Sequence, residues 1–299
     1  MSKIAVIGAG KWGNALFNAF SEKNDCVITS RTKRDIENFV SINEALECEY
    51  LVFSIATQIT DNWLKQNFKN KNQKILITSK GIEAETGRFL DEIFKNYTDE
   101  GNICSLSGPS FATEVMQKLP CAVVVSSKNI ELASEFASFF PSYMKAYVSE
   151  DVIGAEISGA YKNVIAIASG ICDGLKLGNN ARASLISRGL IEMNRFGKFY
   201  GGLDITFLGL SGAGDLFLTA SSKLSRNYRV GFGLAQGKKL DKILDELGEV
   251  AEGVFTSKAI LKLALENEIY TPIANEVALV MDGKSLKDSI NDLMRQDRG

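Results

Sequence analysis

The first half of the chain alternates short apolar runs, rich in β-branched residues, with segments of helical length. This pattern predicts strands that are each followed by a helix or a turn. The predicted strands are Ile4–Ile7, Cys26–Thr29, Tyr50–Ile55, Lys74–Thr78, Ile103–Leu106 and Ala122–Ser126. Strand and helix in alternation indicate a parallel sheet with right-handed crossovers, and such sheets bind ligands at the carboxyl ends of their strands.

The hydrophobic pattern changes after about Ser149. The β-branched runs end there, and long segments with a period of about 3.6 residues follow, separated by Gly-rich junctions. The predicted helices are Ile153–Cys172, Ala181–Lys198, Asn227–Gln236, Phe255–Glu266 and Asn275–Met281. The sequence therefore predicts an α/β domain over residues 1–149 and an all-helical C-terminal domain over residues 150–299.

A glycine-rich turn directly follows the first predicted strand. It reads Gly8-Ala9-Gly10-Lys11-Trp12-Gly13, and the residues after it have a helical pattern. The first glycine permits the tight turn, the second lets a pyrophosphate approach the backbone, and the third lets helix and strand pack closely. In this context the turn predicts a Rossmann-type, doubly wound sheet that binds a dinucleotide at a helix N-terminus. The alternative is a tight turn without a ligand.

The second predicted strand ends in Arg31-Thr32-Lys33-Arg34. A site selective for NAD usually has a carboxylate here to hold the ribose hydroxyls, and this segment has none. Three cations favour a 2′-phosphate, so NADP is favoured over NAD, with Arg31 the leading residue. Lys33 and Arg34 also fit an ordinary solvated loop.

Composition narrows the class of protein. The chain has 299 residues, 45% hydrophobic and 23% charged, which fits a soluble globular protein of two domains. Its formal charge of −2 argues against nucleic-acid binding by a broad basic face. No stretch reaches the roughly eighteen apolar residues of a membrane span, and no signal peptide is recognisable, so a cytoplasmic protein without membrane insertion is expected. Five scattered cysteines suggest neither a metal site nor a disulfide framework.

The chain contains no histidine, which excludes Ser-His and Cys-His pairs and histidine acid–base catalysis. Proton transfer then falls to other side chains, and Lys162 is the only charged residue between Ile157 and Cys172. Burial among small apolar neighbours would disfavour its ammonium form and bring its pKa toward the range useful for proton transfer. The alternative is a lysine that extends its head into water.

Two further segments carry polar groups near glycines. Gly212-Ala213-Gly214-Asp215 presents one carboxylate after a Gly-rich bend, and Ser225-Arg226-Asn227 offers donor types that recognise phosphate at a helix start. Taken separately, Asp215 and Ser225 fit helix N-caps and Arg226 fits a surface charge.

Taken together, these motifs resemble the bacterial NAD(P)-dependent sn-glycerol-3-phosphate dehydrogenases over nearly the whole chain. The ordered set is Gly8-Ala9-Gly10-Lys11-Trp12-Gly13, Ser79-Lys80-Gly81, Ser107-Gly108-Pro109-Ser110-Phe111-Ala112, Tyr161-Lys162-Asn163-Val164, Gly212-Ala213-Gly214-Asp215 and Leu224-Ser225-Arg226-Asn227. Each motif alone is unspecific, whereas their order is highly specific.

The resemblance implies reversible hydride transfer between the nicotinamide and carbon 2 of dihydroxyacetone phosphate or glycerol 3-phosphate, for glycerophospholipid synthesis. It implies that Lys162 transfers the proton and that Lys80 is a second lysine at the substrate, whose charge would lower the pKa of Lys162 and polarise the carbonyl. The helical domain would bind the substrate, no metal would be needed, and a homodimer through that domain is expected.

The resemblance also implies a set of site residues. The substrate-binding residues are Lys80, Gly108, Ser110, Lys162, Asp215, Ser225, Arg226 and Asn227. The cofactor-binding residues combine those of the glycine turn and the cations after the second strand, inferred above, with those that the resemblance adds. They are Gly8, Gly10, Lys11, Trp12, Gly13, Arg31, Lys33, Lys80, Ala112, Arg226, Val250 and Glu252.

Two departures from the family and two competing classes bear on this interpretation. The family's longer insertion after the second strand is missing between Arg34 and Glu44, which predicts a more open adenine side, and Ile55-Ala56-Thr57-Gln58 lacks the family's proline. Hydroxyacid or ketopantoate reductases share the two-domain plan but match the phosphate-contacting motifs less well. A non-catalytic dinucleotide sensor would have no need of both Lys80 and Lys162.

Overall fold

The computed structural model describes residues 3–295, which fall into two compact units. We name residues 3–80 and 89–156 the sheet unit, and residues 81–88 and 157–295 the helical unit. The predicted domains, 1–149 and 150–299, include residues 1–2 and 296–299, which lie outside the described residues. Their boundary stays a prediction.

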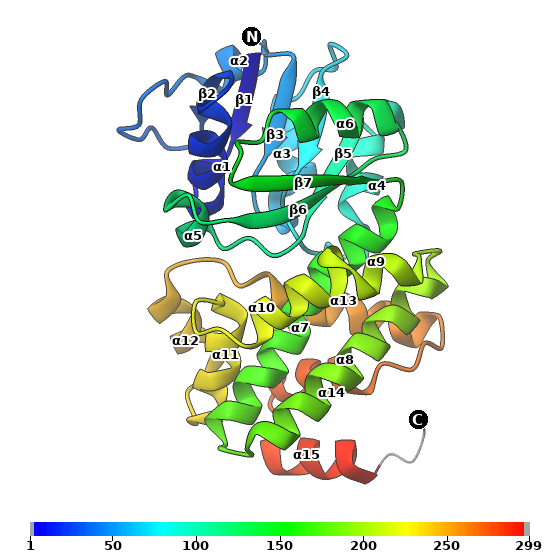
Figure 1. The fold of residues 1–299 in the computed structure, drawn as a ribbon. Helices are drawn as coiled ribbons and strands as arrows, with labels where there is room; N and C mark the ends of the chain where they lie inside the picture. Colours follow the sequence, from blue (N-terminus) through cyan, green and yellow to red (C-terminus); the bar gives the residue numbers. More distant parts are fainter. Residues whose placement is uncertain (1–2, 296–299) are drawn as a thin grey trace. The chain divides into compact units, whose positions relative to one another are not determined.

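The sheet unit is built on seven strands (Figure 1). They are β1 (Lys3–Ile7), β2 (Asp25–Thr29), β3 (Tyr50–Phe53), β4 (Lys74–Ile77), β5 (Ile103–Ser107), β6 (Cys121–Ser126) and β7 (Met144–Ser149). Their order in the sheet is β2-β1-β3-β4-β5-β6-β7, so the chain reverses its direction of winding beside β1. This confirms the predicted doubly wound α/β sheet, in which the point of reversal is the usual ligand site.

The prediction of a fully parallel sheet was wrong at one edge. β6 runs antiparallel to β5, and β7, which was not predicted, pairs parallel with β6. The connection from β5 to β6 contains only the five-residue helix α5 (Ala112–Met116), which is too short to return the chain along the length of a strand for a parallel crossover.

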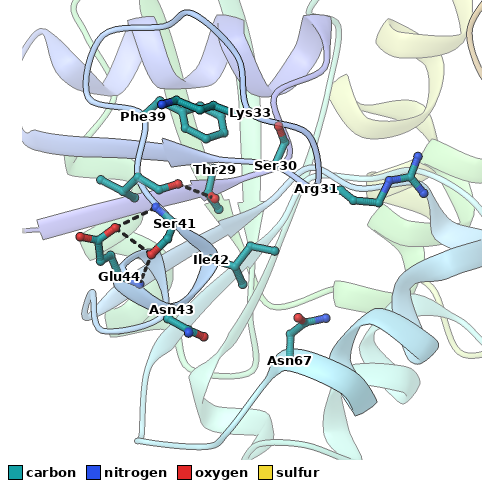
Figure 2. Close-up of a pocket in the computed structure, with 11 residues that line it drawn as sticks. Thr29, Ser30, Arg31, Lys33, Phe39, Ser41, Ile42, Asn43, Glu44 and Asn67 are labelled. Atoms are coloured by element: carbon teal, nitrogen blue, oxygen red, sulfur yellow. Dashed lines mark hydrogen bonds between the residues drawn. The ribbon is translucent and has the colours of Figure 1, made fainter.

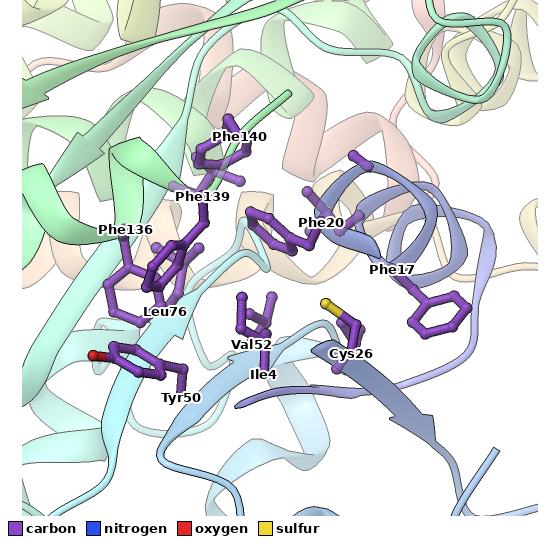
Figure 3. Packing of buried hydrophobic residues seen from close by; sticks show 14 of the residues in the cluster. Ile4, Phe17, Phe20, Cys26, Tyr50, Val52, Leu76, Phe136, Phe139 and Phe140 are labelled. Atoms are coloured by element: carbon purple, nitrogen blue, oxygen red, sulfur yellow. The ribbon is translucent and has the colours of Figure 1, made fainter. Parts of the chain in front are cut away.

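Helices cover both faces of the sheet because the central strands are apolar on both sides. In β1, Ile4 and Val6 belong to one buried cluster, shown in part in Figure 3, while Ala5 and Ile7 belong to another. The first cluster includes residues of α1 (Lys11–Ser21), α5 and α6 (Ile130–Ser138), and the second includes residues of α2 (Ile42–Ala45), α3 (Thr60–Asn67) and α4 (Leu90–Lys95).

A half-buried glutamate, Glu156, is the last residue of the sheet unit. Glu156 accepts hydrogen bonds from Ser105 Oγ at 2.8 Å and from the backbone N–H of Asp91 at 3.2 Å. Burial, with the nearby Asp91 carboxylate, raises the pKa of Glu156 well above its ordinary value. Asp91 itself pairs with Lys95 at 2.7 Å.

The helical unit contains long helices joined by short turns, as predicted. Its helices are α7 (Val152–Gly174), which begins in the sheet unit, α8 (Asn179–Phe199), α9 (Asp204–Leu208), α10 (Asp215–Ala220), α11 (Arg226–Ala235), α12 (Leu240–Leu247), α13 (Glu252–Glu266), α14 (Pro272–Met281) and α15 (Leu286–Arg295). All five predicted helices are present, while α9, α10, α12 and α15 were not predicted.

Two glycines allow α7 and α11 to lie in direct backbone contact. A Cβ built on Gly231 would lie 1.9 Å from Ile167 O, and one on Gly170 would lie 2.0 Å from Tyr228 O. Any side chain at either position would separate the helices. This crossing fixes the N-terminus of α11 relative to the segment of α7 that carries Lys162.

The described residues contain neither a membrane-spanning helix nor a cluster of metal-ligating side chains. Between residues 3 and 295, no helix has both the length and the apolar character needed to cross a bilayer. In the same range, no group of three or more His, Cys, Asp or Glu side chains could hold a metal ion.

Candidate active site

The glycine-rich turn joins β1 to α1 with almost no free space at its first and third glycines. Gly8 has φ +115°, and a Cβ built on it would lie 2.3 Å from Ser54 O. A Cβ on Gly13 would lie 1.8 Å from Gly8 O. The first and third glycines therefore have the structural roles predicted for them.

The middle glycine differs, because a Cβ built on Gly10 would meet no atom within 4 Å. Gly10 is the N-cap of α1 with φ −75°, and its position receives no side-chain hydrogen bond. The first turn of α1 has no acidic residue and begins with Lys11, while Trp12 packs against the first buried cluster. Open space, a positive helix end and a lysine fit the pyrophosphate of a dinucleotide.

A cavity of about 630 Å³ lies beside the carboxyl end of β2 (Figure 2). Its lining comprises Thr29, Ser30, Arg31, Lys33, Phe39, Val40, Ser41, Ile42, Asn43, Glu44 and Asn67. The short segment after Arg34 forms one wall, because the backbone of Ile28 pairs with Asn38 and Val40 on either side of Phe39. The structure thus places Arg31 and Lys33 together at one cavity.

The single carboxylate of this lining is already used within the protein. Glu44 Oε2 accepts hydrogen bonds from Ser41 N at 2.9 Å and Ser41 Oγ at 2.7 Å, which form a capping box at the start of α2. In Figure 2 the Arg31 side chain extends away from this pair. With Arg31 and Lys33 against the one carboxylate of Glu44, the lining carries a net positive charge, which suits a 2′-phosphate.

The loop after β3 is ordered without the proline that the family pattern has there. Thr57–Ile59 forms a 3₁₀ turn that leads into α3, and Ser79 Oγ donates a short hydrogen bond to Ile55 O. This bond ties the loop after β3 to the loop after β4, which carries Lys80.

Lys80, Gly108 and Ser110 lie together at the carboxyl ends of β4 and β5. Lys80 Nζ donates to Gly108 O at 3.1 Å, and Ser110 Oγ donates to the same oxygen at 3.2 Å. Gly108 has φ +103°, which places its carbonyl between the two side chains. Ala112, four residues later, is the first residue of α5.

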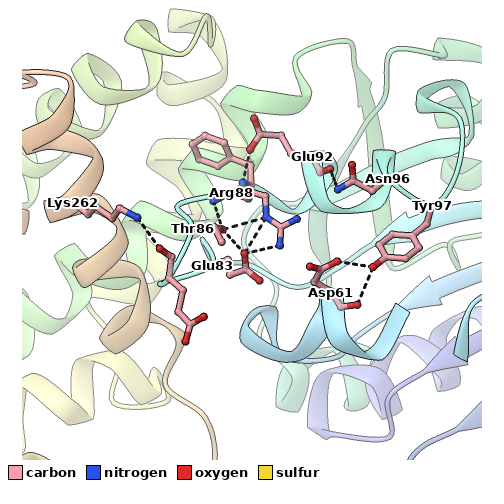
Figure 4. Close-up of polar contacts among 10 residues, drawn as sticks. Asp61, Glu83, Thr86, Arg88, Glu92, Asn96, Tyr97 and Lys262 are labelled. Carbon is pink, nitrogen blue, oxygen red and sulfur yellow. Dashed lines mark hydrogen bonds and ion pairs between the residues drawn. The ribbon is translucent and has the colours of Figure 1, made fainter. Parts of the chain in front are cut away.

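The residues directly after Lys80 belong to the helical unit. Glu83 pairs with Arg88 at 2.9 Å, Thr86 Oγ1 donates to the same carboxylate, and Lys262 Nζ donates to Glu85 O at 2.7 Å (Figure 4). The first two contacts order the 81–88 segment internally, and the bond from Lys262 joins it to α13.

Lys162 is buried, which rules out the alternative of a lysine head in water. Its exposed fraction is 7%, and its Nζ lies 2.5 Å from Asp215 Oδ1 and 3.0 Å from Thr219 Oγ1. Thr219 also lies 3.3 Å from Asp215 Oδ1. An opposite charge at this distance stabilises the ammonium form, the form that can donate a proton. The contact between Lys162 and a carboxylate was not predicted from the sequence. The proximity of Lys162 to Lys80 stays a prediction.

The simple helix-cap interpretation fails for Asp215 and holds for Ser225. Asp215 is the first residue of α10, and Gly214, the end of a π-helical turn over Leu210–Gly214, is the N-cap. Ser225 is the N-cap of α11, and its side chain accepts a hydrogen bond from Tyr228 N at 3.2 Å.

The N-termini of α11 and α13 lie side by side. Asn227 Oδ1 accepts a hydrogen bond from Gly253 N at 3.0 Å, and Arg226 donates to Glu249 at 3.2 Å. Val250 and Glu252 lie in the same short segment, Val250 before α13 and Glu252 as its first residue. The structure therefore brings the predicted residues of these two segments together.

Two residues at these sites were missed by sequence reasoning. Thr219 lies one helical turn after Asp215, so its i+4 spacing could have identified it. Glu249 precedes Val250, but no sequence pattern indicates that it pairs with Arg226.

Comparison with known proteins agrees with the motif order. The protein-family model for the C-terminal domain of NAD-dependent glycerol-3-phosphate dehydrogenase matches residues 151–291. The family model for the N-terminal domain matches residues 31–133. The glycerol-3-phosphate dehydrogenase (NAD(P)+) of Campylobacter jejuni is 64% identical over 295 residues, with 99% of each chain covered. That of Sulfurimonas denitrificans is 59% identical over 283 residues, with 95% of this chain and 96% of the relative covered. The crystal structure of the Coxiella burnetii glycerol-3-phosphate dehydrogenase has a TM-score of 0.90 at 28% identity, over 99% of both chains.

Proposed function

The chain belongs to the NAD-dependent glycerol-3-phosphate dehydrogenase family, and we propose that it catalyses reversible hydride transfer between NAD(P)H and dihydroxyacetone phosphate, giving sn-glycerol 3-phosphate. The observation that carries the proposal is the buried Lys162–Asp215–Thr219 cluster, which is an acid site built without histidine.

In the reducing direction, Lys162 Nζ gives its proton to the oxygen of the substrate carbonyl. Asp215 stabilises the ammonium that this step requires, and Thr219 fixes the direction of Nζ. In the oxidising direction the same nitrogen takes the proton back, as microscopic reversibility demands.

The other substrate contacts follow from chemistry and position. Lys80 supplies a cation for the substrate carbonyl oxygen. Gly108 and Ser110 line the same site, since Lys80 Nζ and Ser110 Oγ both donate to Gly108 O. Arg226 and Asn227 at the start of α11 hold the substrate phosphate, with Asp215 and Ser225 beside the pocket.

The cofactor site extends from the glycine turn to the β2 cavity. Gly8, Gly10 and Gly13 shape the turn, Lys11 and Trp12 begin α1, and the cavity carries Arg31 and Lys33. Ala112, Val250 and Glu252, together with Lys80 and Arg226, complete the proposed set. The cofactor supplies the hydride when bound, and we propose NADP as the preferred form because two cations, Arg31 and Lys33, line the cavity at the end of β2 against the one carboxylate of Glu44.

We propose the following division of roles between the two domains. Residues 1–149 form the dinucleotide-binding domain and residues 150–299 the substrate-binding domain. We propose a cytoplasmic enzyme that uses no metal, forms a homodimer through its helical domain and supplies glycerol 3-phosphate to glycerophospholipid synthesis.

The test is a substrate panel with both cofactors. Purified protein is expected to oxidise NADPH in the presence of dihydroxyacetone phosphate, measured as a fall in the absorbance of the reduced nicotinamide. Lys162→Ala is expected to lower turnover by at least about a thousandfold while leaving NADPH binding intact. Lys198→Ala, which removes an exposed lysine of α8, serves as the control. Unchanged turnover in Lys162→Ala would remove this lysine from the mechanism.

A further inference from the structure

The guanidinium proposed to bind phosphate is in contact with a carboxylate of the same chain. Arg226 Nη1 donates to Glu249 Oε2 at 3.2 Å, and the two side chains are 43% and 28% exposed, respectively. Both residues belong to the helical unit. The exposure leaves the arginine accessible to a ligand, while the contact places an anion where a phosphate would bind.

Local structure brings the carboxylate to this position. Gly248 ends α12 with φ +62°, which turns the chain, and α13 begins at Glu252. The Asn227 side chain holds Gly253 N, and a Cβ built on Gly253 would lie 2.8 Å from Asn163 O. The segment is thus fixed at Gly253, and Glu249 is held within reach of Arg226.

We propose that Glu249 is an internal competitor for the substrate phosphate, and that it weakens substrate binding by occupying Arg226. The inference rests on the proposed function, in which Arg226 binds that phosphate. Carboxylate and phosphate both accept from a guanidinium, and two anions on one guanidinium would repel each other. Phosphate binding therefore requires Glu249 to move aside or to remain at an electrostatic cost.

The expected size follows from the exposure of the pair. A solvent-exposed ion pair changes an equilibrium constant by a factor of about two to five. Removal of the Glu249 charge should therefore tighten phosphate binding by about that factor. The effect should decrease as added salt screens both anions.

The experiment compares Glu249→Gln with the wild type and with Glu246→Gln. Glu246 is an exposed glutamate of α12 paired with Lys238, so the control removes a similar charge three residues away. KM for dihydroxyacetone phosphate and Ki for inorganic phosphate as a competitive inhibitor are measured at low and high salt. In Glu249→Gln both constants should fall about two- to fivefold at low salt with kcat unchanged, while Glu246→Gln stays at the wild-type values.

Failure of the competition by Glu249 and failure of the phosphate assignment to Arg226 give different results. A KM and Ki that stay the same or rise in Glu249→Gln would overturn the competition, and a rise would mean that Glu249 positions Arg226 for the phosphate. Glu249→Ala, which offers no hydrogen-bonding side chain, must change KM and Ki in the same direction as Glu249→Gln. An unchanged KM in Arg226→Ala would instead overturn the phosphate assignment in the proposed function, and the competition with it.

Discussion

The positive charge of Lys162 is paired with a buried carboxylate, so its neighbours have different roles. Asp215 supplies the opposite charge, while Thr219 contacts both members of the pair. A hydroxyl between an ammonium and a carboxylate can accept from one and donate to the other. Thr219 is therefore expected to orient Lys162 without carrying a proton to the substrate.

Thr219→Val should lower kcat by about tenfold, because valine keeps the shape and removes the hydroxyl that holds Nζ. Thr219→Ser should restore most of the rate, since it keeps the oxygen. Steady-state kinetics over a range of pH measure both variants. Equal rates in the valine variant and the wild type would show that the hydroxyl has no part in orienting Lys162.

Arg31→Ala should lower the ratio of NADPH to NADH efficiency about tenfold, because a charge-assisted hydrogen bond to the 2′-phosphate is lost. Arg34→Ala is the matched control, since this exposed cation lies outside the residues that line the cavity. Efficiencies with both cofactors are compared for the three proteins. A ratio unchanged by Arg31→Ala would contradict the assignment.

At the residue scale, sequence reasoning found the isolated lysine but not its partners. Lys162 stands out because no other charge lies near it on its own helix. The resemblance puts Asp215, 53 positions away, among the substrate-binding residues, but its direct contact with Lys162 depends on the tertiary fold and was not predicted. The same holds for Glu249, whose partner is 23 positions earlier.

At the scale of single elements, the β1–α1 turn separates two kinds of glycine. Gly13 is needed for packing, because its missing Cβ would overlap backbone, which cannot move aside as a flexible side chain can. Gly10 has no such neighbour and a φ that any residue adopts. Its role is therefore expected only when a cofactor is bound.

Gly13→Ala should lower the free energy of unfolding by about 3 kcal/mol or more. Gly10→Ala should change it by at most about 1 kcal/mol while raising the Kd for NADPH at least about tenfold, because its methyl group occupies the pyrophosphate path. Urea unfolding and a fluorescence titration provide the two measurements. Normal NADPH affinity in Gly10→Ala would argue against this path.

Several of the missed elements are short or weakly patterned, whereas α12 and α15 are amphipathic helices that the sequence pattern could have identified. β7 reads Met-Lys-Ala-Tyr-Val-Ser and exposes Tyr147 and Val148, so it lacks the apolar run of the inner strands. The direction of β6 could not be predicted, because a parallel and an antiparallel partner bury the same side chains. α9 and α10 are too short to show a helical period in the sequence.

At the scale of the whole molecule, Glu156 should make stability depend on pH. Its pKa is raised in the folded chain by burial, so the folded state binds more protons than the unfolded state above the ordinary carboxyl pKa of about 4.5. Stability should then fall as pH rises from that value to the raised pKa of the folded state, and remain lower above it.

Glu156→Gln should remove this fall, because an amide resembles the protonated carboxyl and its oxygen can still accept from Ser105. At pH 8 the variant should be more stable than the wild type, whereas near pH 5 the two should differ less. Thermal unfolding between pH 5 and pH 8 provides the measurement, with Glu37→Gln in an exposed loop as the control. Parallel pH curves for the variant and the wild type would contradict the expectation.

The 81–88 segment has a consequence for how this chain can be divided. The backbone passes between the sheet unit and the helical unit three times, after Lys80, after Arg88 and within α7 after Glu156. A gene fragment that stops at residue 149 would lack Glu156 and carry eight residues whose packing partners were left behind. The two units are thus not separate modules that recombination could exchange with a single cut, and a functional chimera would have to transfer the 81–88 segment together with α13, on which it is held.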